Sequence, residues 1–160
     1  MDALVPAARG VADRLIARGE TVAVAESSAG GLIAAALLAL PGASAYFRGG
    51  AVVYTKWARE GLLGITEADM AGMRSASEPY ALLMARRVRE RLGADWGFAE
   101  TGAAGPDGNR YGDAPGHACL AVSGPATERV ITLETGQPRR VQNMRAFAAA
   151  LLRLAEEALE

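Results

Sequence analysis

The chain has 160 residues, of which 51% are hydrophobic, and its formal net charge at pH 7 is −1. A chain of this length fits one domain, so we expect a single domain over residues 1–160. The near-neutral charge lacks the basic excess with which proteins bind a phosphate backbone, and this argues against nucleic acid as a partner.

The composition also disfavours membrane association and bound metal. The apolar run 30–40 is shorter than the roughly 20 residues that span a bilayer, and no basic segment precedes an apolar core at the N-terminus. We therefore expect a cytoplasmic protein with no membrane partner. A single cysteine, Cys119, and a single histidine, His117, form no metal-ligand pattern, so we expect neither a metal nor another cofactor.

The predicted elements begin with a covering helix over residues 3–18, where apolar residues recur at helical spacing and Gly19 is a stop signal. An interior strand over 21–25 follows, because this run is too apolar for a strand with one wet face. A helix over 32–40 comes next and ends at the Pro-Gly pair 41–42.

The turn between this strand and this helix reads Glu-Ser-Ser-Ala-Gly-Gly over residues 26–31. Backbone N–H groups at a helix start can receive an anion, which makes Gly30 and Gly31 candidate substrate-binding residues. Ser27 or Ser28 acting as a plain N-cap explains the same residues nearly as well. Both interpretations stay open.

A second strand is predicted over 49–54, and Thr55 is placed to cap the helix that follows it. Lys56, the only lysine, and Arg59 lie three residues apart on this helix and therefore share a face. Capping signals at Thr66 and Ser77 predict a short helix and then a longer one that ends at Leu92.

Ser44, Tyr54 and Lys56 lie close together in the sequence around this second strand. A hydroxyl, a phenol and an amine are the groups of a serine nucleophile that is activated without histidine. The same three residues are also ordinary surface residues of a strand-to-helix junction.

A third strand over 95–101 leads into a glycine-rich segment, 102–109, which permits the close backbone approach that an anion cradle would use. A flexible loop uses the same residues. The candidate substrate-binding residues of this segment are Thr101, Gly102, Ala104 and Gly105.

Two further strands over 116–123 and 129–133 and a last helix after Pro138 complete the chain. This order of elements predicts an α/β fold, in which helices on both faces cover a mixed β-sheet and loops at the carboxyl ends of strands form the site. The residues expected in the core of the sheet are Val22, Val24, Val52, Val53, Phe98, Leu120 and Val122.

Three segments, 25–31, 41–50 and 101–108, resemble the C-terminal domain of the CinA family, the nicotinamide-nucleotide amidases. The resemblance implies a compact α/β amidohydrolase domain that is usually oligomeric. It also implies an activity, the conversion of nicotinamide mononucleotide to nicotinate mononucleotide and ammonia without a metal.

By position, Ser44 matches the nucleophilic serine of the family and Tyr54 matches a tyrosine ten residues later. The catalytic lysine of the family falls at Arg59, and arginine does not readily accept a proton at neutral pH. The chain also departs from the family at Ser28-Ala29 and at Gln137-Pro138.

Two functions follow. In the first, Ser44 attacks the carboxamide of a nucleotide substrate, Lys56 serves as the base, one glycine turn stabilises the oxyanion, and Arg59 or Arg48 helps to bind the phosphate. In the second, the chain is a catalytically impaired CinA-like module that binds a nucleotide or only forms the oligomer. The expected partners are a small-molecule nucleotide and further copies of the chain.

Overall fold

All 160 residues are described by the computed structural model, which is built around a five-stranded sheet in the order β2-β1-β3-β4-β5. The strands are β1 (Val22–Glu26), β2 (Phe47–Val52), β3 (Trp96–Ala103), β4 (His117–Ser123) and β5 (Glu128–Glu134). β1 pairs in parallel with β2 and β3, whereas β4 pairs antiparallel with β3 and β5. The three parallel strands therefore end at one edge of the sheet, which we call the carboxyl edge.

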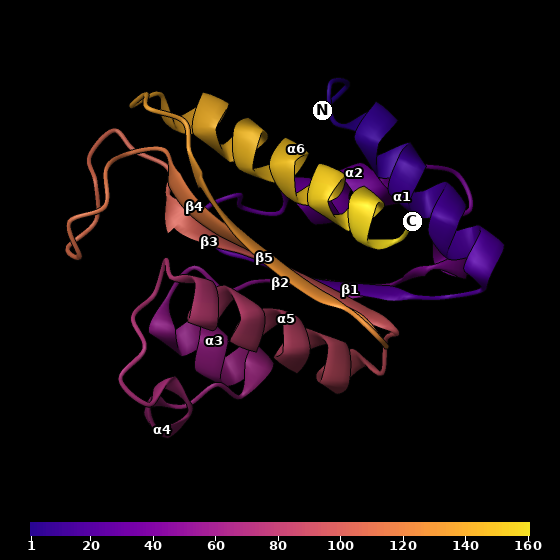
Figure 1. Ribbon diagram of the computed structural model, residues 1–160, viewed down its shortest axis with the longest axis horizontal. Helices are drawn as coiled ribbons and strands as arrows, with labels where there is room; N and C mark the ends of the chain where they lie inside the picture. Colours follow the sequence, from indigo (N-terminus) through magenta and orange to yellow (C-terminus); the bar gives the residue numbers. More distant parts are fainter.

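Helices cover both faces of this mixed sheet, which confirms the predicted fold class (Figure 1). One face carries α1 (Val5–Arg18), α2 (Leu32–Leu38) and α6 (Arg140–Ala158), and the other carries α3 (Lys56–Leu63), α4 (Glu67–Met70) and α5 (Glu78–Leu92). A single 3₁₀ turn, η1 (Ala43–Ala45), precedes β2. None of these helices combines the length and the apolar surface that a membrane crossing requires.

The core consists of one buried cluster on each face of the sheet. All but one of the residues expected in the core are buried. Val52 is the exception, with 44% of its surface exposed. β2 is the outer strand with β1 as its only neighbour, so the side chain of its last residue is left partly uncovered.

Local hydrogen bonds fix the starts of the helices on the α3–α5 face, as the sequence predicts. The hydroxyl of Thr55 accepts from the N–H of Ala58, and that of Ser77 accepts from the N–H of Tyr80. Thr66 and Asp69 form a reciprocal capping box at the start of α4. These caps fix where the chain enters each helix.

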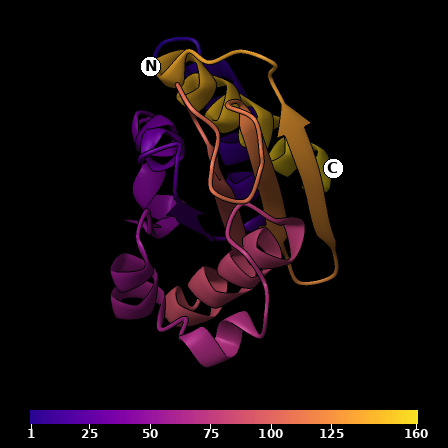
Figure 2. The same ribbon diagram turned by 90° about the vertical axis from the view of Figure 1, so that its left-hand side faces the viewer.

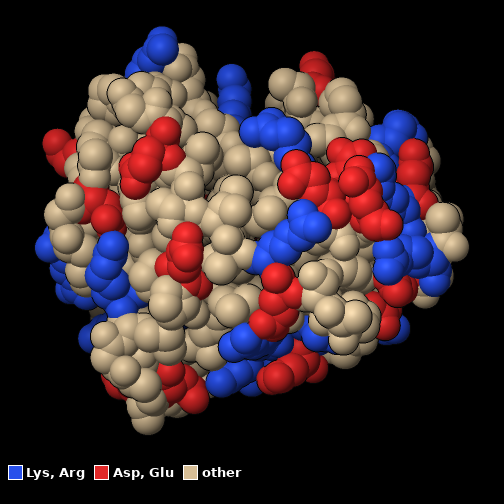
Figure 3. Space-filling model, in the orientation of Figure 1, with Lys and Arg blue, Asp and Glu red and all other residues tan.

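Acidic and basic side chains are interspersed on the face seen in Figure 3, with no wide area of a single sign. Ion pairs join part of the charged side chains of the protein, among them Arg14 with Glu156 and Arg86 with Glu128. This surface therefore offers no strong field to a charged macromolecule.

Candidate functional site

A cavity of about 680 Å³ opens at the carboxyl edge, where Figure 2 looks directly onto the molecule. Its lining comes from the ends of the three parallel strands, from the connection 53–59, from residues 67–80 and from the loop around 109–111. Loops after parallel strands are where α/β folds place their ligand sites. We call this cavity the edge pocket.

Three cations and one carboxylate line the edge pocket: Lys56, Arg59, Arg110 and Glu67. Arg59 is the buried one, because its guanidinium lies 5.7 Å from the centroid of the Tyr80 ring and its Nη2 is 3.0 Å from Oε1 of Glu67. Burial raises the pKa of the Tyr80 phenol, which therefore stays protonated. The excess of positive charge suits a phosphate or carboxylate group.

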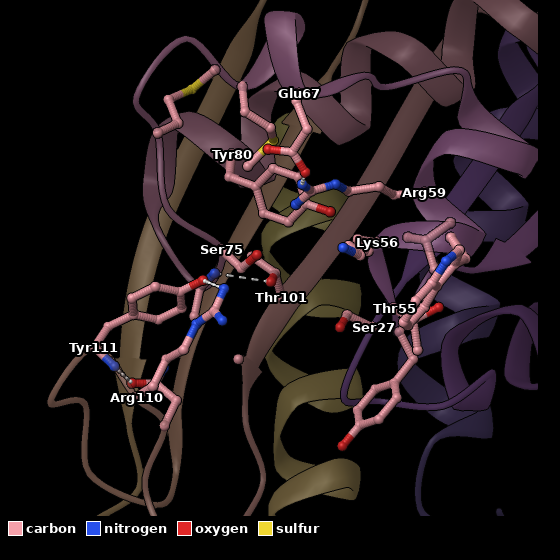
Figure 4. A pocket seen from close by; sticks show the side chains of 18 residues that line it. Ser27, Thr55, Lys56, Arg59, Glu67, Ser75, Tyr80, Thr101, Arg110 and Tyr111 are labelled. Carbon is pink, nitrogen blue, oxygen red and sulfur yellow. Dashed lines mark hydrogen bonds and ion pairs between the residues drawn. The ribbon is translucent and has the colours of Figure 1, made fainter.

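Lys56 is exposed, unlike Arg59, although both belong to the first turn of α3. Figure 4 shows its ammonium group pointing into the cavity, between Arg59 and Ser27. Its nearest aromatic contact is the ring of Trp57, 5.1 Å away. The prediction that Lys56 and Arg59 share a face is confirmed, since both line one pocket.

Ser27 is the serine that the edge pocket receives from the end of β1. Its hydroxyl has no hydrogen-bond partner in the protein. The neighbouring hydroxyls are engaged: that of Ser28 donates to Glu100, that of Thr55 caps α3, and that of Thr101 accepts from the N–H of Ala76 at 3.1 Å. The Ser27 hydroxyl is therefore free to meet a ligand.

Two buried glutamates hold the turn that carries Ser27. Glu26 accepts from the N–H groups of Gly31, Ile33 and Ala34 at 2.9–3.1 Å. Burial raises the pKa of Glu26 above its ordinary value, and the three N–H groups act in the opposite direction. Glu100 accepts hydrogen bonds from the other half of the turn, which is Ser27, Ser28 and Ala29.

This arrangement corrects both interpretations of the turn 26–31. Gly31 donates its N–H to Glu26 and Gly30 donates to the carbonyl of Ser27, so neither group is available to a substrate anion. Ser27 and Ser28 are not N-caps either, because α2 begins after Gly31 without a side-chain cap. The carboxylate of Glu26 performs that task from the preceding strand.

Ser44 does not lie at the edge pocket, contrary to expectation. It is exposed on η1, just before β2, and the carbonyl of the nearby Tyr46 accepts from the N–H of Val22 at the start of β1. Ser44 therefore lies at the opposite edge of the parallel strands, because a strand separates it from Tyr54. Tyr46, whose hydroxyl donates to the carbonyl of Leu37 at 2.6 Å, gives this segment a structural role.

Of the remaining site residues predicted from the sequence, some line the edge pocket and the others are hydrogen-bonded to α6. Tyr54, Thr101 and Gly102 line the pocket, with Tyr54 58% exposed and its hydroxyl accepting from Nη2 of Arg140 at 3.2 Å. Ala104 and Gly105 do not line it. Their carbonyls accept from the side chains of Asn143 and Arg140 on α6, which ties this loop to the opposite helical layer.

One wall of the pocket was not expected from the sequence. The ring of Tyr111 lies 5.2 Å from the guanidinium of Arg74 and 5.1 Å from that of Arg110. Arg110 also donates to the Tyr111 hydroxyl at 3.0 Å, and this hydrogen bond lowers the pKa of Tyr111. The position of this loop after the β3 strand was the available signal.

The fold and the pocket define a class: an α/β domain whose site lies beyond the carboxyl ends of three parallel strands. The chain belongs to the CinA C-terminal domain family, whose model matches residues 5–159. The resemblance noted in the sequence is therefore confirmed at the level of the family.

Relatives and solved structures agree with this assignment. A CinA-like protein of Gloeobacter violaceus is 44% identical over 125 residues, covering 78% of this chain and 29% of that protein. A CinA-like protein of Anaeromyxobacter sp. strain K is 44% identical over 147 residues, covering 91% and 36%. The chain thus spans about a third of the length of these relatives.

Two crystal structures share the fold over almost the whole chain. The competence-damaged protein (CinA) superfamily protein from Enterobacter cloacae has a TM-score of 0.89 at 27% identity, covering 98% of this chain and 92% of that one. The competence/damage inducible protein CihA from Agrobacterium tumefaciens has a TM-score of 0.89 at 30% identity, covering 98% and 94%.

Proposed function

We propose that the protein is a serine amidohydrolase that converts nicotinamide mononucleotide to nicotinate mononucleotide and ammonia. One observation carries the proposal: the unpartnered hydroxyl of Ser27 opens onto the same pocket as the amine of Lys56. A serine beside a lysine is a recurring alternative to a histidine-based triad. The resemblance to the nicotinamide-nucleotide amidases supplies the substrate class.

In the proposed reaction, the Ser27 oxygen adds to the carboxamide carbon and its proton passes to Lys56 in the uncharged form. The carbon–nitrogen bond then breaks, Lys56 returns the proton to the nitrogen, and ammonia leaves. Water adds to the resulting ester in the same way and releases the carboxylic acid product and Ser27. The Thr101 hydroxyl, which accepts from Ala76, keeps its own hydrogen for the substrate oxygen.

The cations of the pocket support a phosphate-bearing substrate. Arg110 is exposed, so its side chain can adjust to a bound phosphate. Arg59 is fixed against Tyr80, so its guanidinium is already in place when a phosphate binds between the two. Hydrogen bonds to a charged group contribute about 1.5–3 kcal/mol each. The ring of Tyr111, which is only partly buried, offers surface to a pyridine ring.

A second candidate is a nucleotide-binding module without catalysis. It is favoured by Arg59, which stands where the resemblance places the catalytic lysine and is already engaged by Glu67 and Tyr80. Such a guanidinium serves as a fixed ligand for phosphate and not as a base.

The test measures ammonia release from nicotinamide mononucleotide and, in parallel, binding by calorimetry. We expect the wild type to turn over, and we expect Ser27→Ala to lower kcat by at least about a hundredfold while binding is retained. Ser44→Ala is the matched control, because it removes the same hydroxyl at the opposite edge, and it should leave the rate unchanged. Binding without turnover in the wild type would favour the module.

The control also tests the location of the nucleophile. If Ser44→Ala abolished turnover and Ser27→Ala did not, the proposed nucleophile would be wrong. The reacting serine would then have to come from a second copy of the chain, since Ser44 lies away from the pocket of its own chain. The oligomeric state in solution would have to show that second copy.

A further inference from the structure

Glu100 is the most completely buried carboxyl group beside the edge pocket. It lies near the end of β3, its exposed fraction is 0%, and its side chain turns toward the end of β1. No motif in the sequence indicates a role for it. A carboxyl group in such a place is costly to bury unless hydrogen bonds compensate it, so its partners indicate what it does.

Those partners are three consecutive residues of the turn that carries the proposed nucleophile. The N–H of Ser27 donates to Oε2 at 3.1 Å, the N–H of Ala29 donates to Oε2 at 2.7 Å, and the hydroxyl of Ser28 donates to Oε1. The Ser27 N–H also lies 3.1 Å from the main-chain carbonyl of Glu100. The N–H of Ser27 is thus shared between the carboxylate and the main-chain carbonyl of Glu100, while the Ser27 hydroxyl is left free.

We propose that Glu100 is a positioning residue for Ser27, and that its buried carboxylate fixes the turn 27–29 so that the Ser27 hydroxyl faces the edge pocket. This inference rests on the proposed function for the part that concerns turnover. The part that concerns the turn is independent of it. Misplacement of a reacting group by about 1 Å can lower a rate by about a hundredfold, so a rigid turn matters.

The charge state of Glu100 follows from its partners. All three groups that face its two oxygens are arranged as donors, which suits a carboxylate, whereas a protonated carboxyl must donate one hydrogen itself. Burial raises the pKa of Glu100 to about 7, and hydrogen bonds from Ser28, Ala29 and Ser27 oppose that effect. Glu26, from the neighbouring strand β1, is the charged group that also raises it. Protonation of Glu100 would therefore cost the turn one of these three hydrogen bonds.

The first experiment compares Glu100→Gln with the wild type. The amide keeps the shape of the side chain but presents an NH₂ group to a set of donors, so one hydrogen bond to the turn is lost. We expect kcat to fall at least about tenfold with KM within about threefold, because the phosphate-binding cations are untouched. We also expect amide hydrogen exchange at Ser27 and Ala29 to quicken at least about tenfold.

A matched control is Glu20→Gln. Glu20 also uses its carboxylate to hold a partner, the indole N–H of Trp96 at 2.6 Å, but it lies at the opposite end of the sheet. Its replacement should leave both the rate and the exchange of the turn unchanged. A loss of rate in this control would indicate a general effect of removing a carboxylate charge and would overturn the assignment to Glu100.

Ser28→Ala tests the same inference with a smaller change of side chain, and the direction in which it shifts the pKa of Glu100 is known in advance. Without the Ser28 hydroxyl the carboxylate of Glu100 loses a donor, so its pKa rises further. The acidic limb of the pH profile of kcat should then move to higher pH by at least about half a unit. In Glu100→Gln the part of the limb that belongs to Glu100 should be absent, whereas the dependence on the uncharged form of Lys56 should remain. An unmoved limb would overturn the role of Glu100 in turnover.

The two proposals can fail separately. If the wild type releases no ammonia while Glu100→Gln still quickens exchange at Ser27 and Ala29, the amidase function is wrong and Glu100 still positions the turn. If exchange at these residues is the same in Glu100→Gln and wild type, the positioning role is wrong whatever the activity. Faster exchange over the whole chain would indicate unfolding and would equally contradict a local role.

Discussion

Truncation of Glu26 to alanine tests the most unusual structural feature of the turn, a carboxylate from a strand that caps the helix after it. Glu26 is 1% exposed and accepts from Gly31, Ile33 and Ala34. In Glu26→Ala these three N–H groups lose their acceptor at once. The variant therefore measures how much the capping carboxylate contributes to the free energy of unfolding.

The magnitude follows from the burial of each donor. The N–H of Ile33 is buried and costs about 1–3 kcal/mol when it is left unpaired, whereas those of Gly31 and Ala34 are partly buried and regain water at a smaller cost. Removal of a carboxylate whose pKa is raised by burial returns part of this free energy. We expect a net loss of about 2–4 kcal/mol, a large share of the roughly 5–15 kcal/mol that stabilises a domain.

Urea unfolding followed by far-UV circular dichroism measures this loss as a lower midpoint with an unchanged m-value. Glu60→Ala is a suitable control, because Glu60 is exposed on α3 and should change the free energy of unfolding by no more than about 0.5 kcal/mol. A loss below about 1 kcal/mol for Glu26→Ala would refute the reasoning. It would mean that water reaches the start of α2 and that the carboxylate is not needed there.

Two further predictions concern the pocket and the strand behind it. Arg59→Lys should leave the activity of the proposed amidase intact or raise it, because lysine keeps the positive charge and adds a second possible base. Ammonia release measures this activity. A complete loss would show that turnover needs the guanidinium itself. Burial lowers the pKa of His117, but its hydrogen bonds to Glu134 at 2.5 Å and to the carbonyl of Ala76 at 2.8 Å outweigh this effect and raise it. Protonated His117 therefore stabilises the fold fully below about pH 6.5, and this contribution is lost as the pH rises through the raised pKa. The free energy of unfolding of His117→Gln should lack this fall above about pH 6.5.

Much of the fold could be predicted because its signals are local. Capping at Thr55, Thr66 and Ser77 depends on a hydroxyl and an N–H three residues away, so the residue order alone reveals it. The continuous apolar runs that form β1 and β4 reflect burial on both faces of the sheet. Local hydrogen bonding and burial thus sufficed for the order of elements and the two helical layers.

The site could be predicted only in part, because nearness in sequence is misleading along a strand. Ser44 and Tyr54 are ten residues apart, but the six residues of β2 alone extend about 20 Å and carry them to opposite edges. Ser27 and Lys56 are 29 positions apart and reach one edge because each follows a parallel strand. The topology rule that sites lie at carboxyl ends would have favoured Ser27, which follows a strand, over Ser44, which precedes one.

The glutamates of the turn could not be predicted from local patterns. Glu100 meets Ser27 across 73 positions of sequence through the pairing of β1 with β3, and this register is known only once the sheet is formed. The glycines of the turn looked available for an anion because their partners were missing from the local sequence. A backbone N–H that a distant carboxylate already occupies cannot serve a substrate.

Position 59 is best understood from the two environments that the first turn of α3 provides. Arg59 is directed toward Tyr80 and Glu67, where a permanent cation makes fixed contacts and where loss of a proton would break them. Lys56 is exposed and directed into the opening, where an amine can exchange protons with a ligand. The two cations are therefore not interchangeable, and the presence of arginine at the inner position still leaves the pocket an amine that can act as a base.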